Sequence, residues 1–226
     1  MSEAAKLGSN RALAWYVEAM RIFKRHPLGF AGLSGIIIVT ELAITAIPAV
    51  GPLAANIVVP LLACSLLFAA LATDRNDRPR LKHLIAPFTA PAGAMGAVVV
   101  ASLIVFAIQW MIARVVGDID LMAGEGIVAP DPLVIIAIYG GGIAASLPMT
   151  LVPMLALFEG NNAREAFAGS LAAFLQNLPA FLLYGAISIA LAGIGLLTFG
   201  IALLIVVPLW AASSYAAWKD LSGLGR

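Results

Sequence analysis

Apolar stretches that are long enough to cross a bilayer recur along most of the chain. Each contains few charged residues and is close to the length of about 20 residues that a transmembrane helix requires. We expect six such helices, at residues 28–47, 52–72, 92–116, 132–158, 179–197 and 199–217. Only the short segment GIGLLTFG separates the last two, so one long re-entrant hairpin is the alternative there. The pattern predicts an all-α, polytopic membrane protein with one domain over residues 1–226.

Helical periodicity also predicts amphipathic helices before two of these spans. Residues 1–27 predict a cytoplasmic amphipathic helix that ends at Pro27, with a polar face and an apolar face formed by Leu13, Val17, Met20 and Phe23. A similar segment precedes residue 179, and in it Asn162 and Glu165 have the spacing of a capping box. A shorter pattern over residues 81–88 is interrupted by prolines, so it is an eroded copy or a coincidence.

One proline-centred phrase occurs three times, as NIVVPLLACS, TLVPMLALFE and LIVVPLWAAS. All three copies lie in even-numbered spans, which favours an internal repeat of an interfacial helix and a helical hairpin, in two or three copies. Pro60, Pro153 and Pro208 each remove an amide donor and are expected to kink their helices. The kinked helices either surround a small polar interior or are bent for packing alone.

Composition and charge fix the class of protein and its orientation. The chain is 62% hydrophobic and 11% charged, with a mean hydropathy of +1.01, far more apolar than a soluble domain. The net charge of +1 gives no reason to expect nucleic acid as a partner. The one cysteine, Cys64, lies in an apolar run, so we expect it to be buried.

The positive charges are distributed very unevenly between the two predicted sides. With the N-terminus inside, all Lys and Arg residues except Arg114 fall in cytoplasmic segments, whereas the outer loop after residue 116 is acidic. The positive-inside rule therefore predicts that both termini are cytoplasmic. Anionic headgroups at the cytoplasmic face are expected to contact Arg21, Lys24, Arg25, Arg78, Arg80 and Lys82.

Glu41 is the strongest candidate for chemistry, because a carboxylate inside a span costs about 2.5 kcal/mol or more unless it is protonated, paired or hydrated. Its expected partner is Arg114, with Gln109 one or two turns away. The pair is either an ion pair that locks two spans together or part of a proton or substrate site. Asn56 is either an interhelical hydrogen bonder or a cavity-lining residue. Glu159 lies either below the cytoplasmic surface or just outside a helix that ends early.

Motifs of soluble enzymes are absent from the sequence. We find no GxxxxGK[ST] phosphate loop, no HExxH and no GxSxG, and the predicted cytoplasmic loops are short. His26 and His83 lie far apart without a second ligand at helical spacing, so no metal site is expected. We therefore expect neither an enzyme nor a cofactor.

The layout resembles that of a known group of proteins. The segments that carry the resemblance are the helix around Trp15, FKRHP before the first span, and AGSLAAFLQNLPAFLLYG before the fifth. The chain resembles bacterial inner-membrane proteins of the YciC-like kind, which are related to the membrane domain fused to some glycerophosphodiester phosphodiesterases. This resemblance implies a six-span, multi-pass protein of the bacterial inner membrane and supplies no catalytic residues.

Two functions fit these observations. The first is a permease-like or lipid-handling protein that binds a lipid or another small hydrophobic molecule, with Glu41, Arg114 and Asn56 at the site. The alternative is a non-transporting accessory or scaffolding subunit, whose interfacial helices dock a protein partner or a second copy of the chain.

Overall fold

The structure, a computed structural model, describes residues 10–122 and 131–223, and within these ranges it contains helices and no strands. The α-helices are α1 (Asn10–Arg25), α2 (Pro27–Thr45), α3 (Gly51–Asp74), α4 (Ala92–Gly117), α5 (Pro132–Ser146), α6 (Val152–Leu157), α7 (Ala163–Gln176), α8 (Leu178–Leu197) and α9 (Leu203–Leu221). Three short 3₁₀ helices join them, η1 (Leu81–Leu84), η2 (Ala86–Thr89) and η3 (Leu147–Met149). The predicted all-α class is confirmed.

Five helical segments of the described chain are long and apolar enough to cross a membrane, at Pro27–Thr45, Gly51–Asp74, Ala92–Gly117, Pro132–Met149 and Leu178–Leu197. They correspond to the first five predicted spans, most of them to within about two residues. The sixth predicted span corresponds to α9, which does not belong to this set. The second half of α9 carries hydroxyl side chains and, in its last turn, Lys219 and Asp220, which lower its hydropathy.

The fourth predicted span, 132–158, is not one helix. It is divided into α5, η3 and α6, because Pro148 and Pro153 stand at the starts of η3 and α6 and interrupt helical hydrogen bonding. Ser170 of α7, which is buried, satisfies the backbone at this break. Its hydroxyl donates to the carbonyl oxygen of Pro148 (2.7 Å), and its oxygen accepts from the amide of Leu151 (3.2 Å).

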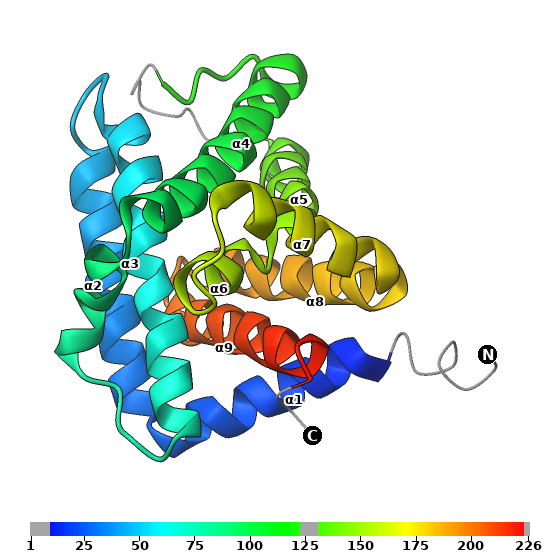
Figure 1. The fold of residues 1–226 in the computed structure, drawn as a ribbon. Coiled ribbons are helices and arrows are strands. Elements are labelled where there is room, and N and C mark those ends of the chain that lie inside the picture. Colours follow the sequence, from blue (N-terminus) through cyan, green and yellow to red (C-terminus); the bar gives the residue numbers. More distant parts are fainter. Residues whose placement is uncertain (1–9, 123–130, 224–226) are drawn as a thin grey trace.

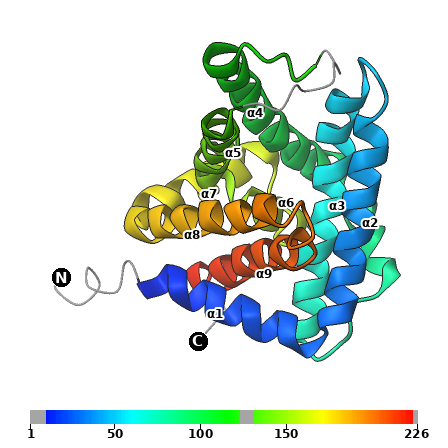
Figure 2. The ribbon, with the colours of Figure 1, turned by 180° about the vertical axis from the view of Figure 1, so that it is seen from behind.

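The helices form two groups that run in different directions (Figure 1). The α2–α3 hairpin stands upright, and α4 leans away from it. In contrast, α1, α8 and α9 run crosswise to the hairpin, as the view from behind also shows (Figure 2). Helices that cross a bilayer tilt by about 20° on average and up to roughly 40°. If α2 and α3 stand upright in a bilayer, α8 is therefore strongly inclined to the membrane normal. This arrangement differs from a bundle in which all spans stand upright.

The crosswise group is held together by α1, which packs along α9. Trp15 is 2% exposed and lies 5.4 Å from the ring of Phe181 in α8, measured between ring centroids. The indole N–H of Trp15 donates to Asp220 Oδ2 at 3.0 Å. Ala12 and Ala19 are fully buried and permit close approach of α1 to its neighbours.

The buried face of α1 is not the one that the sequence pattern favours. Of the four residues predicted to form the apolar face, only Phe23 is buried, whereas Leu13 and Val17 are 51% and 70% exposed. Trp15 and Ile22 are buried instead. Both faces of this helix carry apolar residues, and the face with the large aromatic ring is the one that contacts α8 and α9.

The segments before the third and fifth predicted spans differ from each other. At the start of α7 the predicted capping box is confirmed, because Asn162 Oδ1 accepts from the amide of Glu165 (3.0 Å) and Glu165 Oε2 accepts from the amide of Asn162 (3.3 Å). Residues 81–89 form η1 and η2 rather than an α-helix. The prolines at 87 and 91 account for this difference.

Candidate functional site

A cavity of about 500 Å³ lies where α3, α4 and α5 meet the crosswise helices α8 and α9. We call it the central cavity. Helices that cross steeply touch over a short length, so space remains beside the contact. The side chains around the central cavity are mainly apolar and include Cys64, Val105, Ile143, Met149, Val207 and Ala211. Cys64 is 4% exposed, which confirms that the thiol is buried.

Two of the three repeated prolines line the central cavity. Pro60 lies inside α3, as expected. Pro153 also lines the cavity but stands at the start of α6, so it begins a helix rather than kinking one. Pro208 lies inside α9 as expected and is buried away from the cavity lining.

Hydroxyl groups supply much of the polarity of the central cavity. Ser188 and Ser214 line it, and so does Tyr184, whose hydroxyl lies 3.0 Å from Ser214 Oγ. Ser188 Oγ lies 2.7 Å from the hydroxyl of Tyr16 in α1. Burial raises the pKa of Tyr16 well above its usual range, so this phenol stays protonated. The indole N–H of Trp210, another lining residue, is buried and has no partner within the described chain.

A second cavity, of about 640 Å³, adjoins the first. We call it the Glu41 cavity, after the one charged side chain among the described residues that line it. Pro60, Gln109 and Tyr139 line both cavities, so the two meet at these residues. Asn56 also lines the Glu41 cavity. The structure thus brings together three of the predicted site residues, Glu41, Asn56 and Gln109.

The two amide side chains of the Glu41 cavity are held in different ways. Asn56 Nδ2 donates to the carbonyl oxygen of Pro52 in its own helix (2.9 Å), and Asn56 Oδ1 accepts from Ser102 Oγ in α4 (3.5 Å). Asn56 is therefore both an interhelical hydrogen bonder and a cavity-lining residue. Gln109 lies against Gly142 of α5, where a Cβ atom would overlap its side chain.

Arg114 is not the partner of Glu41 in this structure. The Arg114 guanidinium lies 3.9 Å from the carboxylate of Asp118, one turn further along the chain, and both side chains are exposed. The Glu41 carboxylate makes no hydrogen bond or ion pair with the described residues, although the backbone carbonyl oxygen of Glu41 accepts from Thr45 Oγ1 (2.7 Å). The expected helix-locking ion pair is therefore not formed, and Glu41 remains available at its cavity.

Glu159 belongs to a different region. Helix α6 ends at Leu157, so Glu159 lies just outside a helix that ends early, one of the two arrangements expected. Its Oε1 accepts from the indole N–H of Trp218 in α9 at 2.6 Å. Both residues line a third hollow, apart from the two cavities described above.

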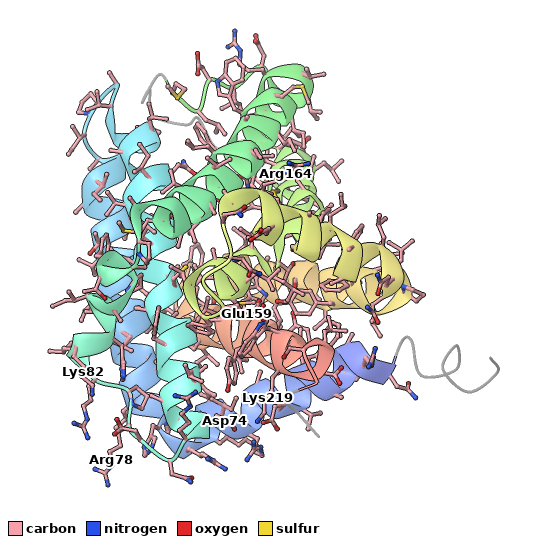
Figure 3. The ribbon with its side chains drawn as sticks, in the orientation of Figure 1. Asp74, Arg78, Lys82, Glu159, Arg164 and Lys219 are labelled. Carbon is pink, nitrogen blue, oxygen red and sulfur yellow. The ribbon has the colours of Figure 1, made fainter. Side chains whose placement is uncertain are left out.

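A cluster of charged residues joins the ends of α3 and α9 to α1 (Figure 3). Its centre is Asp74, whose side chain is 13% exposed. Asp74 accepts hydrogen bonds from Lys219 Nζ (2.6 Å), the Tyr215 hydroxyl (2.9 Å) and Arg21 Nη2 (3.4 Å). Arg21 also pairs with Glu18. We call these five residues the Asp74 cluster.

Several of the predicted headgroup contacts have partners within the protein. Arg21 belongs to the Asp74 cluster, and Arg25 donates to the carbonyl oxygen of Thr73 at 3.1 Å. Arg80 and Lys82 lie 2.9 and 4.0 Å from the carboxylate of Asp77. These four side chains therefore contribute to internal contacts as well as to the basic surface.

The basic residues that the sequence places on one side lie at different levels of the molecule. Arg78 and Lys82 lie beside the lower end of the α2–α3 hairpin in the view of Figure 3, and Lys219 lies in the lower half of the molecule, to the right of them. Arg164 lies well above them in that view, at the start of α7. Lys24 and Arg78 are exposed.

The sequence does not signal several residues that shape these sites. Asp74 resembles an ordinary flanking charge at the end of a span, and Ser170 resembles filler in a helix rich in small residues. Tyr184 lies in the segment AGSLAAFLQNLPAFLLYG and Ser188 lies just after it, but nothing in the sequence marks either residue as part of a site. Their spacing of four places both on one helical face, which is the one local signal that they share a surface.

Comparisons with known proteins give no relative for this chain: no protein family, no curated protein and no solved structure matches it. Within residues 10–122 and 131–223, no group of three or more His, Cys, Asp or Glu side chains is placed to hold a metal ion.

Proposed function

We propose that this protein is a multi-pass membrane protein that binds a lipid or another small hydrophobic molecule in its central cavity, in a permease-like or lipid-handling role. The central cavity is the observation that carries the proposal. Its volume of about 500 Å³ falls within the range of roughly 300–1,000 Å³ that ligand sites occupy. Its mainly apolar lining with a few convergent hydroxyl groups is typical of such sites.

A ligand cavity inside a bilayer must select its ligand from the surrounding lipid. Inside a bilayer, an apolar molecule already has apolar surroundings, so burial of apolar surface alone gives little preference for the protein. A cavity that takes one molecule in preference to bulk lipid therefore depends on shape and on polar contacts. Tyr184, Ser188 and Trp210 provide such contacts in the central cavity, and Glu41 provides one beside it.

The membrane placement is part of the same proposal. Five apolar helices support insertion in a bilayer. We place the protein in the bacterial inner membrane with both termini cytoplasmic, because the positive charges are concentrated in the segments that this orientation puts inside. The six-span count, the internal repeat and the kinship with YciC-like proteins belong to this proposal and rest on the sequence pattern.

Native mass spectrometry of the protein, released gently from membranes, tests the proposal. Ala192 of α8 lines the central cavity, whereas Ala190 of the same helix is exposed. Ala192→Phe should remove a lipid or small-molecule adduct, and Ala190→Phe should leave it in place. A bare wild-type protein, or one that leaves the membrane with another polypeptide in all three forms, would instead favour an accessory or scaffolding subunit.

A further inference from the structure

We propose that the ligand is an amphipathic monocation, whose apolar body occupies the central cavity and whose amine or ammonium group lies beside Glu41. This inference rests on the proposed function and names the class of molecule that the site accepts.

The two cavities adjoin each other. They share Pro60, Gln109 and Tyr139, so these side chains are the ones that lie between a molecule in the central cavity and the Glu41 cavity. Gly142, which faces Gln109, helps to keep this junction open, because a side chain there would push Gln109 aside.

The charged side chains around the two cavities favour a cation. The described residues that line the two cavities include one carboxylate, Glu41, and no Lys, Arg or His. Arg114, the nearest expected counter-charge, pairs with Asp118 instead. Glu41 is exposed at the side of an apolar helix, so inside a bilayer its carboxylate lies in apolar surroundings, where it attracts a cation strongly because no cation of the described residues pairs with it. An anionic ligand would meet repulsion at the same place.

The polarity of the lining differs between the central cavity and the Glu41 cavity. The central cavity offers apolar side chains and neutral hydroxyl groups, which suit a body without charge. Towards Glu41 the polar side chains of Asn56, Gln109 and Tyr139 appear, and the ring of Tyr139 also offers a π face to a cation. Polarity therefore increases along the path, as it does along an amphipathic molecule.

Dodecyltrimethylammonium and dodecyl sulfate, used below their micellar concentrations, are suitable probes, because both have the same apolar chain with one charge at its end and the two charges are opposite. Binding would be measured by equilibrium dialysis on the full-length protein in nanodiscs of phosphatidylcholine, with empty nanodiscs subtracted. The wild type should bind the cation at least about tenfold more tightly than the anion. Glu41→Gln should remove this preference, and Glu41→Asp should keep most of it.

Asp118→Asn is the matched control, because it also removes one negative charge but does not touch either cavity. It should leave the preference for the cation unchanged. The thermal midpoint of each variant, followed through the fluorescence of buried Trp15, verifies that the fold is intact.

The outcomes separate the two proposals. If the wild type binds both ions equally, and Glu41→Gln and the wild type behave alike, the central cavity binds apolar molecules but the cationic class is wrong. If neither ion binds above empty nanodiscs, both the cationic class and the proposed function fail. If Ala192→Phe leaves cation binding intact, the apolar body does not occupy the central cavity.

Discussion

The Asp74 cluster predicts a specific loss of stability when its central carboxylate is neutralised. In Asp74→Asn, the side-chain oxygen still accepts from the Tyr215 hydroxyl, but the pairs with Lys219 and Arg21 lose their charge. The contact with Lys219, at 2.6 Å, is short and partly buried, whereas the contact with Arg21, at 3.4 Å, is long and weak.

The magnitude follows from these contacts. A hydrogen bond between charged groups contributes about 1.5–3 kcal/mol, and removal of one partner leaves a partly buried ammonium unpaired. The Lys219 side chain is 27% exposed, so water recovers part of this loss. We therefore expect Asp74→Asn to lower the free energy of unfolding by about 2–3 kcal/mol, or the thermal midpoint by roughly 5–10 °C in a chain of this size.

Tryptophan fluorescence provides the assay, because the indole of Trp15 is buried in the folded protein and becomes exposed when the helices separate. The thermal midpoint of the fluorescence change would be compared for the wild type, Asp74→Asn, Lys219→Met and the double variant. The two single effects should not add, since both remove the same pair; the coupling free energy should be about 1–2 kcal/mol. Asp77→Asn, which alters an exposed pair nearby, should leave the midpoint unchanged. An unchanged midpoint in Asp74→Asn, or fully additive single effects, would refute the reasoning.

Three further predictions concern local packing and protonation. Gly142→Ala should lower the thermal midpoint, because the new methyl group overlaps Gln109. In the same helix, a methyl group at position 140 meets no atom within 4 Å, so Gly140→Ala should raise the free energy of unfolding slightly, by up to about 1 kcal/mol. Ser170→Ala should reduce the free energy of unfolding by about 1–3 kcal/mol, measured in the same fluorescence assay, because it leaves a part-buried carbonyl oxygen and a buried amide without partners. Burial and the neighbouring Lys82 lower the pKa of His83, so at pH 7.5 its ring is neutral and Nδ1 accepts a hydrogen bond from the amide of Arg80. This hydrogen bond is lost as the pH falls through the lowered pKa. Hydrogen exchange in residues 80–85, corrected for pH, should therefore be faster at pH 5 than at pH 7.5, and equal rates at both pH values would contradict this.

The ends of the apolar helices could be predicted from the sequence, because they depend on the hydropathy of each stretch of the chain and on the residues next to it. The boundaries of α2, α3, α4 and α8 agree with the predicted spans, and Asn162 caps α7 as its spacing indicates. The break in the fourth predicted span also has a local signal, because Pro148 and Pro153 both lie in that span.

The packing between helices could not be predicted in the same way. The sequence around α1 does not indicate that Trp15 is buried and that Val17, two positions along, is exposed. Both residues are apolar, and which of them is buried depends on the packing of α1 against α8 and α9. Glu41 was identified by its cost in an apolar span, but its expected partner was wrong since Arg114 has a nearer acid in Asp118. Long-range neighbours such as Lys219 and Asp74 require the folded chain.

Photolabelling tests the central claim most directly. A lipid with a diazirine on its acyl chain would be irradiated with the protein in membranes, and the labelled residues would be mapped by peptide mass spectrometry. The account predicts labels on residues that line the central cavity, Ala63, Val105 and Ala211, that decrease in Ala192→Phe but not in Ala190→Phe. Labels confined to exposed apolar side chains such as Leu133 and Leu175 would contradict it, because those positions report only the surrounding bilayer.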